Sequence, residues 1–401
     1  MSLCCVCKQN SLECIIDFGQ QPVSHHYLYT QKEAAFTYAF QLGMCTACGL
    51  VQLINPPSME ETKPLFSWIS FSEPENHLDW LVEKLSQLPG VTTSSQFCGV
   101  SVFEDSLLER LNKKNFLRTD CLTYDKNLGN ATHAVIKTIS LYAKHQNLSQ
   151  LFHDRPHVLI IRDILEHAHD PLSFMQTIKE IVDPDGYVVF EIPDYQRTFI
   201  SCDYSTLWEE HITYFTPYTF ETCLKRGGFM IHSIDSYAYD AQDYLIAIVK
   251  PSHQMESNVI HDDQDALFSA QQLMMHYAER YSQQKNWFKN VLSQYQKQGK
   301  IALLGAGHLG CHFVNLMDVQ HLIDFLVDDH PHKRGMFMPG SRLPIVSSSI
   351  LDEEHVMLCL LSLNQESEKN FIEKNKKFIE RGGTFASIFP SSKLALASYS
   401  S

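Results

Sequence analysis

Short apolar runs and helical stripes alternate along most of the chain. Apolar runs bounded by polar or glycine-containing turns predict buried strands at 157–161, 187–192 and 300–304. Apolar residues at helical spacing predict helices over 76–90 and 172–182. Strands that alternate with helices in this way favour an open α/β sheet with helices on its faces.

Two later segments depart from that alternation. The strand candidates 229–234 and 244–249 follow each other with no helical pattern between them, which suits an antiparallel hairpin at a sheet edge. Residues 264–298 carry a long, aromatic-rich helical pattern, for which we expect one or two linking helices. A second α/β alternation begins at residue 299, and the polar stretch 126–132 predicts a loop.

Length and charge exclude several classes of protein. The 401 residues allow two or three domains, and the hydrophobic fraction of 44% supplies a sizeable core. The 32 Lys and Arg residues against 46 Asp and Glu residues give a net charge of −14, which argues against non-specific binding to nucleic acid or membrane surfaces. No apolar run reaches the roughly 20 residues of a membrane span. The first residues lack a signal-peptide pattern, so we expect a cytoplasmic protein.

The N-terminal cysteines indicate a metal site. Four of the 12 cysteines fall within the first 14 residues. Cys4 and Cys7, and then Cys45 and Cys48, have the spacing that lets a turn point two thiolates at one tetrahedral ion. Without a secretion signal, a metal is favoured over disulfides, and we predict a structural zinc held by these four thiolates. Cys5 could compete for one position, and unrelated buried or free cysteines are the alternative.

A glycine-rich loop opens the second α/β unit. Gly305, Gly307 and Gly310 form a G-x-G-x-x-G run that follows an apolar strand and precedes a helix. Asp328 and Asp329 end the next predicted strand, which gives the spacing of a dinucleotide-binding fingerprint and makes NAD a candidate cofactor. The same loop can instead cradle a diphosphate at a helix N-terminus without any nicotinamide.

Four stretches together resemble the sugar C-methyltransferases, three-part enzymes that use S-adenosylmethionine (SAM). They are D-x-G-x-x-P-V-S over 17–24, C-x-x-C-G-L-V-Q-L over 45–53, E-H-x-x-Y-F over 210–215 and D-x-x-x-x-K-x-G-x-x-x-P-G over 328–340. The resemblance implies an α/β fold, with a class I methyltransferase Rossmann-like sheet flanked by a small N-terminal zinc module and a C-terminal Rossmann-like domain. The implied divisions are a zinc module (1–60), a methyltransferase-like domain (61–252), a helical linker (253–298) and the C-terminal domain (299–401).

The resemblance also implies catalytic roles. His211 matches the family's general base and Glu210 the acid beside it, while Asp163 and His167 match an N-x-x-x-H pattern with Asp in place of Asn. Methylation of a carbon next to a ketone first requires removal of an α-proton, which a histidine that titrates near neutral pH can take. His167 or a backbone donor can stabilise the enolate oxygen. The alternative is that His211 only anchors a loop.

The loop expected to bind SAM departs from the family pattern. The stretch 97–105 holds a single glycine, Gly99, followed by Ser101, and Asp120 is a candidate for the acidic residue after the second strand. This loop alone would not predict SAM binding. Two other hypotheses therefore stay open, namely an NAD-dependent sugar-modifying enzyme and a non-catalytic binding protein that keeps the scaffold.

Trp68 and Lys333 are the candidate substrate-binding residues. The segment 66–77 lies where the family has a tyrosine- and serine-rich stretch near the sugar, although it equally suits a connecting loop with a helix cap at Glu73. The favoured function is SAM-dependent C-methylation of a nucleotide-linked keto-sugar, or a related small molecule, through an enolate. Because the net charge repels an anionic nucleotide sugar, local basic groups or helix N-termini must hold it.

Overall fold

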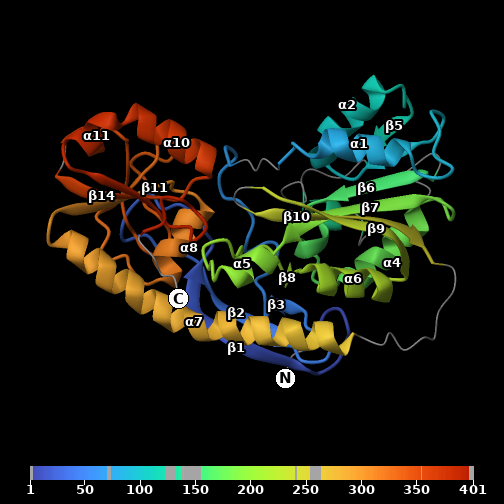
Figure 1. Ribbon diagram of the computed structural model, residues 1–401, viewed down its shortest axis with the longest axis horizontal. Coiled ribbons are helices and arrows are strands. Elements are labelled where there is room, and N and C mark those ends of the chain that lie inside the picture. Colours follow the sequence, from blue (N-terminus) through green and yellow to red (C-terminus); the bar gives the residue numbers. More distant parts are fainter. Residues whose placement is uncertain are drawn as a thin grey trace.

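The computed structural model describes residues 3–69, 74–122, 132, 134–137, 139, 155–239, 242–252, 263–353 and 355–396. The strands in these ranges form sheets of four, six and five strands. In Figure 1 the six-stranded and five-stranded sheets lie on opposite sides, and the long helix α7 (Gln264–Gln296) runs below both beside β1 and β2 of the four-stranded sheet. The expected loop at 126–132 lies outside the described residues apart from residue 132, and so does the expected cap Glu73.

The four-stranded sheet takes its last strand from far along the chain. It is antiparallel, with the order β1 (Leu12–Pro22), β2 (Thr37–Cys45), β3 (Val51–Leu53) and β8 (Thr213–Tyr214). Val51 pairs with Tyr214, and Gln52 pairs with Thr213. The N-terminal sheet therefore extends beyond the expected 1–60 segment, and its extra strand begins two residues after His211.

The six-stranded sheet has the order β5 (Thr119–Cys121), β4 (Phe97–Gly99), β6 (Val158–Arg162), β7 (Tyr187–Asp194), β10 (Asp243–Pro251) and β9 (Phe229–Tyr237). The first four strands are parallel, and β10 runs antiparallel to both of its neighbours. The expected edge hairpin is thus confirmed as β9 and β10, and the sheet has the arrangement expected of a class I methyltransferase.

Helices and 3₁₀ turns join these strands. They are α1 (Leu78–Ser86), η1 (Val102–Glu104), α2 (Asp105–Lys113), η4 (Leu165–His167), α4 (Pro171–Ile181), α5 (Gln196–Ile200) and α6 (Pro217–Arg226). The residues at the N-termini of α4 and α6 explain where these two helices begin. Asp170 and Thr216 cap α4 and α6 by accepting a backbone N–H, and a proline follows each cap at the first helical position, where it has no N–H to lose.

The five-stranded sheet is parallel throughout, as the second α/β alternation predicts. Its order is β13 (Ile345–Val346), β12 (Phe325–Val327), β11 (Lys300–Leu304), β14 (Val356–Leu361) and β15 (Thr384–Ser387). The accompanying helices are α8 (His308–Leu316), α9 (Ile350–Glu353), α10 (Gln365–Lys374) and α11 (Lys376–Glu380). Within the described ranges, no helix combines the length and the apolar character needed to cross a membrane.

One continuous apolar core joins the four-stranded and five-stranded sheets, and a second core joins the N-terminal cysteines to the six-stranded sheet. The first core contains Phe40 of β2, Tyr277 of α7 and Tyr204, which precedes β8. The hydroxyl of Tyr204 donates to the carbonyl oxygen of Tyr277 at 2.5 Å, and the hydroxyl of Tyr27 donates to the carbonyl oxygen of Ala306 at 2.6 Å. Full burial of one such side chain stabilises a fold by about 2 kcal/mol. The N-terminal module is therefore packed onto the six-stranded sheet, and the C-terminal unit is packed onto the N-terminal sheet and the segment that follows β7.

Candidate functional site

A small cavity lies where β6 and β7 end, at the carboxyl edge of the six-stranded sheet. This first cavity has a volume of about 50 Å³ and is lined by all four expected catalytic residues, Asp163, His167, Glu210 and His211. Each of the four is at most 8% exposed. The carboxyl edge is where open α/β sheets bind ligands, so the position suits a reacting centre.

The backbone of the turn after β6 positions Asp163 at the first cavity. Asp163 directly follows β6 with a φ of +54°, a left-handed conformation that a non-glycine residue rarely adopts and that is often found at functional sites. Its N–H donates to the carbonyl oxygen of Glu191 at 3.0 Å. The N–H of Ile212 donates to the carbonyl oxygen of Glu166 at 2.8 Å. The turn after β6 and the segment that carries His211 are thus bonded to each other.

His211 lies in the first cavity as a neutral imidazole. Its Nδ1 is 2.5 Å from the hydroxyl of Tyr195, and its ring meets the ring of His167 edge-on with 4.6 Å between centroids. Burial and the charge of His308 lower the pKa of His211 to about 3, with Glu209 opposing the shift. In the tautomer whose Nδ1–H donates to the Tyr195 oxygen, Nε2 carries the lone pair that can accept a proton from a reactant.

Two consecutive buried glutamates meet histidines from the two flanking units. Nε2 of His25 lies 2.7 Å from Oε1 of Glu210, and Nε2 of His312 lies 2.9 Å from Oε2 of Glu209. The N–H of Ser24 also donates to Glu209 at 2.5 Å. Burial alone would raise the pKa of Glu209, but the charge of His312 and its hydrogen bond outweigh burial and hold that pKa far below its usual range.

A second cavity, of about 250 Å³, lies where the three units meet. Both expected substrate-binding residues, Trp68 and Lys333, line it together with Gly307 of the glycine-rich loop. Trp208 lines both cavities, so the second cavity adjoins the first at this ring.

Stacked rings form part of the wall of the second cavity. The rings of Trp208 and His308 are nearly parallel, with an angle of 12° and 4.4 Å between centroids. Trp68 stacks on His332 at an angle of 16° with 5.6 Å between centroids.

The glycine-rich loop brings the N-terminus of α8 to the second cavity. Gly305 has a φ of +99°, and a Cβ on Gly310 would lie 2.2 Å from the carbonyl oxygen of Gly305, so both positions require glycine. Asp328 accepts the N–H of Ala306 at 3.1 Å and pairs with Lys333 at 3.0 Å. A ribose hydroxyl would have to displace these bonds, so the geometry gives NAD no support.

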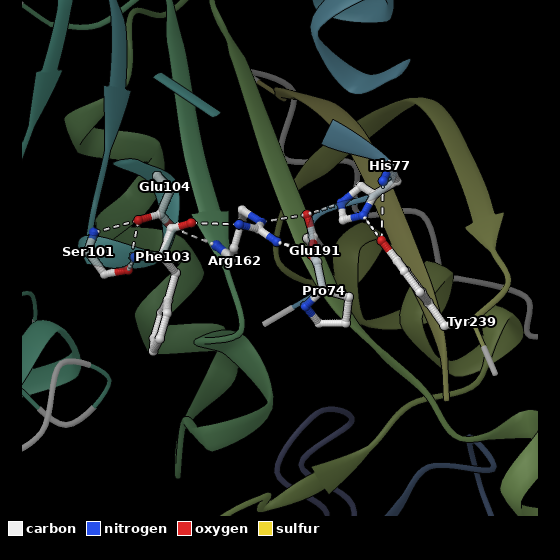
Figure 2. A network of polar contacts seen from close by, with 8 residues as sticks. All are labelled: Pro74, His77, Ser101, Phe103, Glu104, Arg162, Glu191 and Tyr239. Atoms are coloured by element: carbon white, nitrogen blue, oxygen red, sulfur yellow. Dashed lines mark hydrogen bonds and ion pairs between the residues drawn. The ribbon is translucent and has the colours of Figure 1, made fainter. Parts of the chain in front are cut away.

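The loop expected to bind SAM is closed on itself, as Figure 2 shows. In the six-stranded sheet, β5 lies on one side of β4 and β6 lies on the other. Open α/β sheets bind ligands where the strand order reverses in this way, so a ligand is expected at the carboxyl ends of β4 and β6. Glu104 fills that place. Its carboxylate accepts the N–H and the hydroxyl of Ser101, both at 2.7 Å, and the backbone N–H of Arg162 at 2.8 Å. A Cβ on Gly99 would lie 2.6 Å from the Cβ of Glu104.

The side chain of Arg162 extends this network across the sheet. Its guanidinium donates to both carboxylate oxygens of Glu191, at 2.8 and 2.9 Å, and to the carbonyl oxygen of Phe103 at 2.6 Å. Glu191 in turn lies 2.9 Å from Nε2 of His77. The donors of Ser101 and Arg162 are thus used within the chain, and the closed arrangement of these described residues does not fit SAM.

The expected cofactor-binding residues therefore do not converge. Gly99 and Ser101 are buried in the closed loop, and neither lines the first or the second cavity. Asp120 is exposed on β5, where its carboxylate accepts the N–H of Cys121 at 2.8 Å. Burial raises the pKa of Glu104 to about 7, although its hydrogen bonds and Arg162 favour the ionised form.

The four expected zinc ligands meet at one point. The Sγ atoms of Cys4 and Cys48 are 3.7 Å apart, those of Cys7 and Cys45 are 3.4 Å apart, and all four lie within 4.8 Å of one another. Thiolates bound to one tetrahedral zinc at about 2.3 Å are separated by roughly 3.8 Å, so the residues fit this ion. Cys5 stays outside the cluster, buried in the apolar core.

Several residues that shape the cavities were not singled out in the sequence. His25, Trp208 and His308 line the second cavity, Glu166 lines the first, and Tyr195 holds an imidazole there. His308 lies inside the glycine-rich motif, Trp208 lies two residues before the E-H-x-x-Y-F motif, and His25 directly follows the motif over 17–24. Closeness to these motifs is therefore the sequence signal that could have identified the three residues. Tyr195 lies outside those motifs, and no local signal marks it.

Three family models match the chain one after another. "Putative zinc binding domain" matches residues 4–62, "Methyltransferase domain" matches residues 98–234, and "C-methyltransferase C-terminal domain" matches residues 246–390. C-methyltransferase NovU of Streptomyces niveus is 21% identical over 413 residues, a match that covers 98% of this chain and 97% of NovU.

Solved structures resemble the chain only in part. The 1,6-didemethyltoxoflavin-N1-methyltransferase of Burkholderia thailandensis is 11% identical with a TM-score of 0.31, covering 44% of this chain and 79% of its own. The CcbJ methyltransferase of Streptomyces caelestis is 9% identical with a TM-score of 0.31, covering 47% of this chain and all of its own. Likeness at these TM-scores carries no argument, so the assignment rests on the three family models and NovU. The chain belongs to the three-domain family of SAM-dependent C-methyltransferases.

Proposed function

We propose that this enzyme methylates the carbon next to the ketone of a nucleotide-linked keto-sugar. One observation carries the proposal. The histidines and carboxylates of the first cavity adjoin, at Trp208, the larger cavity lined by Trp68 and Lys333. A small reacting centre beside a roomy, partly aromatic and basic chamber suits a sugar carbon attached to a large anionic remainder.

His211 is the proposed base. Its Nε2 accepts the proton from the carbon next to the ketone, and the electron pair of that C–H bond becomes the enolate. His167, whose ring meets that of His211, is the proposed donor to the enolate oxygen. The low pKa of His211 keeps it unprotonated before substrate arrives, and a nearby enolate or phosphate favours the imidazolium that forms. SAM, when bound, supplies the methyl group.

The second cavity supplies the means to hold a nucleotide diphosphate. The N-terminus of α8 points its free N–H groups toward the cavity at Gly307, where a Cβ would meet nothing within 4 Å. Lys333 adds a positive charge at the same wall. These local groups offset the net charge of −14, which by itself repels such a substrate.

A second candidate function is binding without catalysis. The closed Glu104 loop favours it, because the described loop offers SAM no open donors in this form. The two candidates differ in one measurable property. The proposed enzyme binds S-adenosylhomocysteine once Glu104 moves aside, whereas a binding protein of this kind does not bind it at all.

We also propose that the four-cysteine cluster holds a structural zinc. With four thiolates the ion has no open position for catalysis, so it stabilises the N-terminal sheet. That sheet includes β8, which begins two residues after His211. The zinc therefore supports the catalytic segment through backbone pairing.

Replacing His211 by Ala should lower kcat for methyl transfer by about a hundredfold to ten-thousandfold, because the general base is lost. Transfer of labelled methyl groups from SAM to a nucleotide-linked keto-sugar measures this. The matched control is His276→Ala on the exposed face of α7, which should leave kcat unchanged. Turnover of the His211 variant within tenfold of wild type would contradict the role.

Replacing Lys333 by Met should raise the KM for the nucleotide sugar by about tenfold with little change in kcat, because one charge contact to the phosphates is worth about 1.4 kcal/mol. Steady-state kinetics at fixed SAM separates the two constants. Lys297→Met, at an exposed position beyond α7, is the control. A fall in kcat at constant KM would place Lys333 elsewhere in the reaction.

Replacing Glu104 by Ala should tighten S-adenosylhomocysteine binding by about tenfold, because Ser101 and Arg162 regain free N–H donors and the space above Gly99 opens. Isothermal titration measures the affinity, and circular dichroism checks the fold. Glu109→Ala, exposed on α2, should leave affinity unchanged. Unchanged or weaker binding by a folded Glu104 variant contradicts competition at this loop.

The purified chain should contain one zinc ion, and Cys45→Ser should lower both the zinc content and the thermal unfolding temperature, because metal binding and folding of the module are coupled. Elemental analysis and calorimetry on the same samples give both values. Cys14→Ser is the control, since Cys14 is exposed and outside the cluster. Full zinc occupancy in the Cys45 variant would show that the ligands lie elsewhere.

A further inference from the structure

One buried ion pair spans the two cavities. His25 lines the second cavity and Glu210 lines the first, and their side chains meet at 2.7 Å with side-chain exposures of 6% and 2%. His25 comes from the loop after β1, in the N-terminal module. A residue of the zinc module thus touches a carboxylate of the methyltransferase site directly.

The neighbouring pair provides a comparison. Glu209 also pairs with a histidine, His312 of α8, and it accepts the N–H of Ser24 as well. Glu209 lines neither cavity. Glu209 therefore acts on His211 only through its charge, whereas Glu210 lines the cavity where the reaction is proposed.

The electrostatic surroundings favour the charged form of His25. Burial alone lowers the pKa of His25, but the hydrogen bond to Glu210 and the charges of Glu210 and Glu209 outweigh burial and raise it. Three basic groups face His25, namely His26 beside it, and His308 and Lys333 across the second cavity. Burial lowers the pKa of His26 and lowers that of His308 to about 3, so neither histidine opposes the imidazolium of His25 with a full charge near neutral pH. On balance the imidazolium form of His25 persists to higher pH than that of a free histidine.

We propose that His25 is a positioning residue that holds the carboxylate of Glu210 ionised and aimed at the first cavity. The contact itself is independent of substrate, whereas its effect on turnover rests on the proposed function. Glu210 and His211 line the first cavity together, and a negative charge on Glu210 adds to that of Glu209, which favours the imidazolium form of His211. Without His25, the buried carboxylate loses its counter-charge and its pKa rises.

The contact can be tested without any substrate. Nuclear magnetic resonance of the His25 ring protons, titrated in the full chain, should give a pKa above that of a free histidine in the wild type. In Glu210→Gln that pKa should fall by about one unit or more, because the paired charge is gone. An unchanged His25 pKa in the Glu210 variant overturns the proposal whether or not the enzyme acts on a keto-sugar.

The effect on turnover has its own signature. In His25→Gln the acid limb of the kcat/KM profile should move to higher pH by about one unit, with activity recovering above it, because Glu210 now protonates more easily. The control is His26→Gln, since the neighbouring His26 bonds the carbonyl oxygen of Lys63 and not Glu210. A uniform loss of activity at every pH, with an unmoved acid limb, indicates a merely structural role and overturns the proposal.

Discussion

Two consecutive buried glutamates hold this molecule together where its three units meet. Glu209 and Glu210 lie in the methyltransferase unit, yet their partners His312 and His25 belong to the C-terminal unit and the N-terminal module. Carboxylates this deeply buried are tolerated only when paired, and removing one partner of a buried pair typically costs about 3–5 kcal/mol. The flanking units are therefore needed to keep the central segment folded and charged.

The two buried glutamate–histidine pairs also fix the position of the candidate site. Trp208 directly precedes the two glutamates, and its ring lies between the first and second cavities. His211 follows them, and β8 then enters the N-terminal sheet. One short segment thus carries a residue that lines both cavities, two buried charges and the proposed base, and its two glutamates are paired with histidines of both neighbouring units.

The closed loop above β4 and β6 shows a second way in which buried charge shapes the enzyme. Arg162 is almost fully buried, and its guanidinium is satisfied by Glu191 and by backbone carbonyl oxygens. Removing Glu104 therefore leaves the paired charges of Arg162 and Glu191 intact. Of these side chains, only Glu104 covers Gly99. A substitution of Glu104 can therefore open the loop without breaking the ion pair that stabilises the sheet.

Local features of the chain were predictable, and distant pairings were not. Residue spacing and periodicity within short stretches predict the cysteine pairs, the edge hairpin and the glycine-rich loop. The structure contains all three. The continuation of the N-terminal sheet into β8 and the pair of His25 with Glu210 join residues more than 150 positions apart. No period or motif encodes such contacts, because they arise only when the units pack. Glu104 was overlooked for a related reason, since a carboxylate after a strand reads as an ordinary helix start.

Hydrogen exchange at the acceptor carbon tests the central claim most directly. The enzyme is incubated in deuterated water with a nucleotide-linked keto-sugar and S-adenosylhomocysteine, so that deprotonation can occur without methyl transfer. The account predicts that deuterium enters the carbon next to the ketone at an enzyme-dependent rate, as expected when a buried base forms an enolate. Methyl transfer from SAM to the same sugar without any such exchange, and with the product methylated on oxygen, would contradict it.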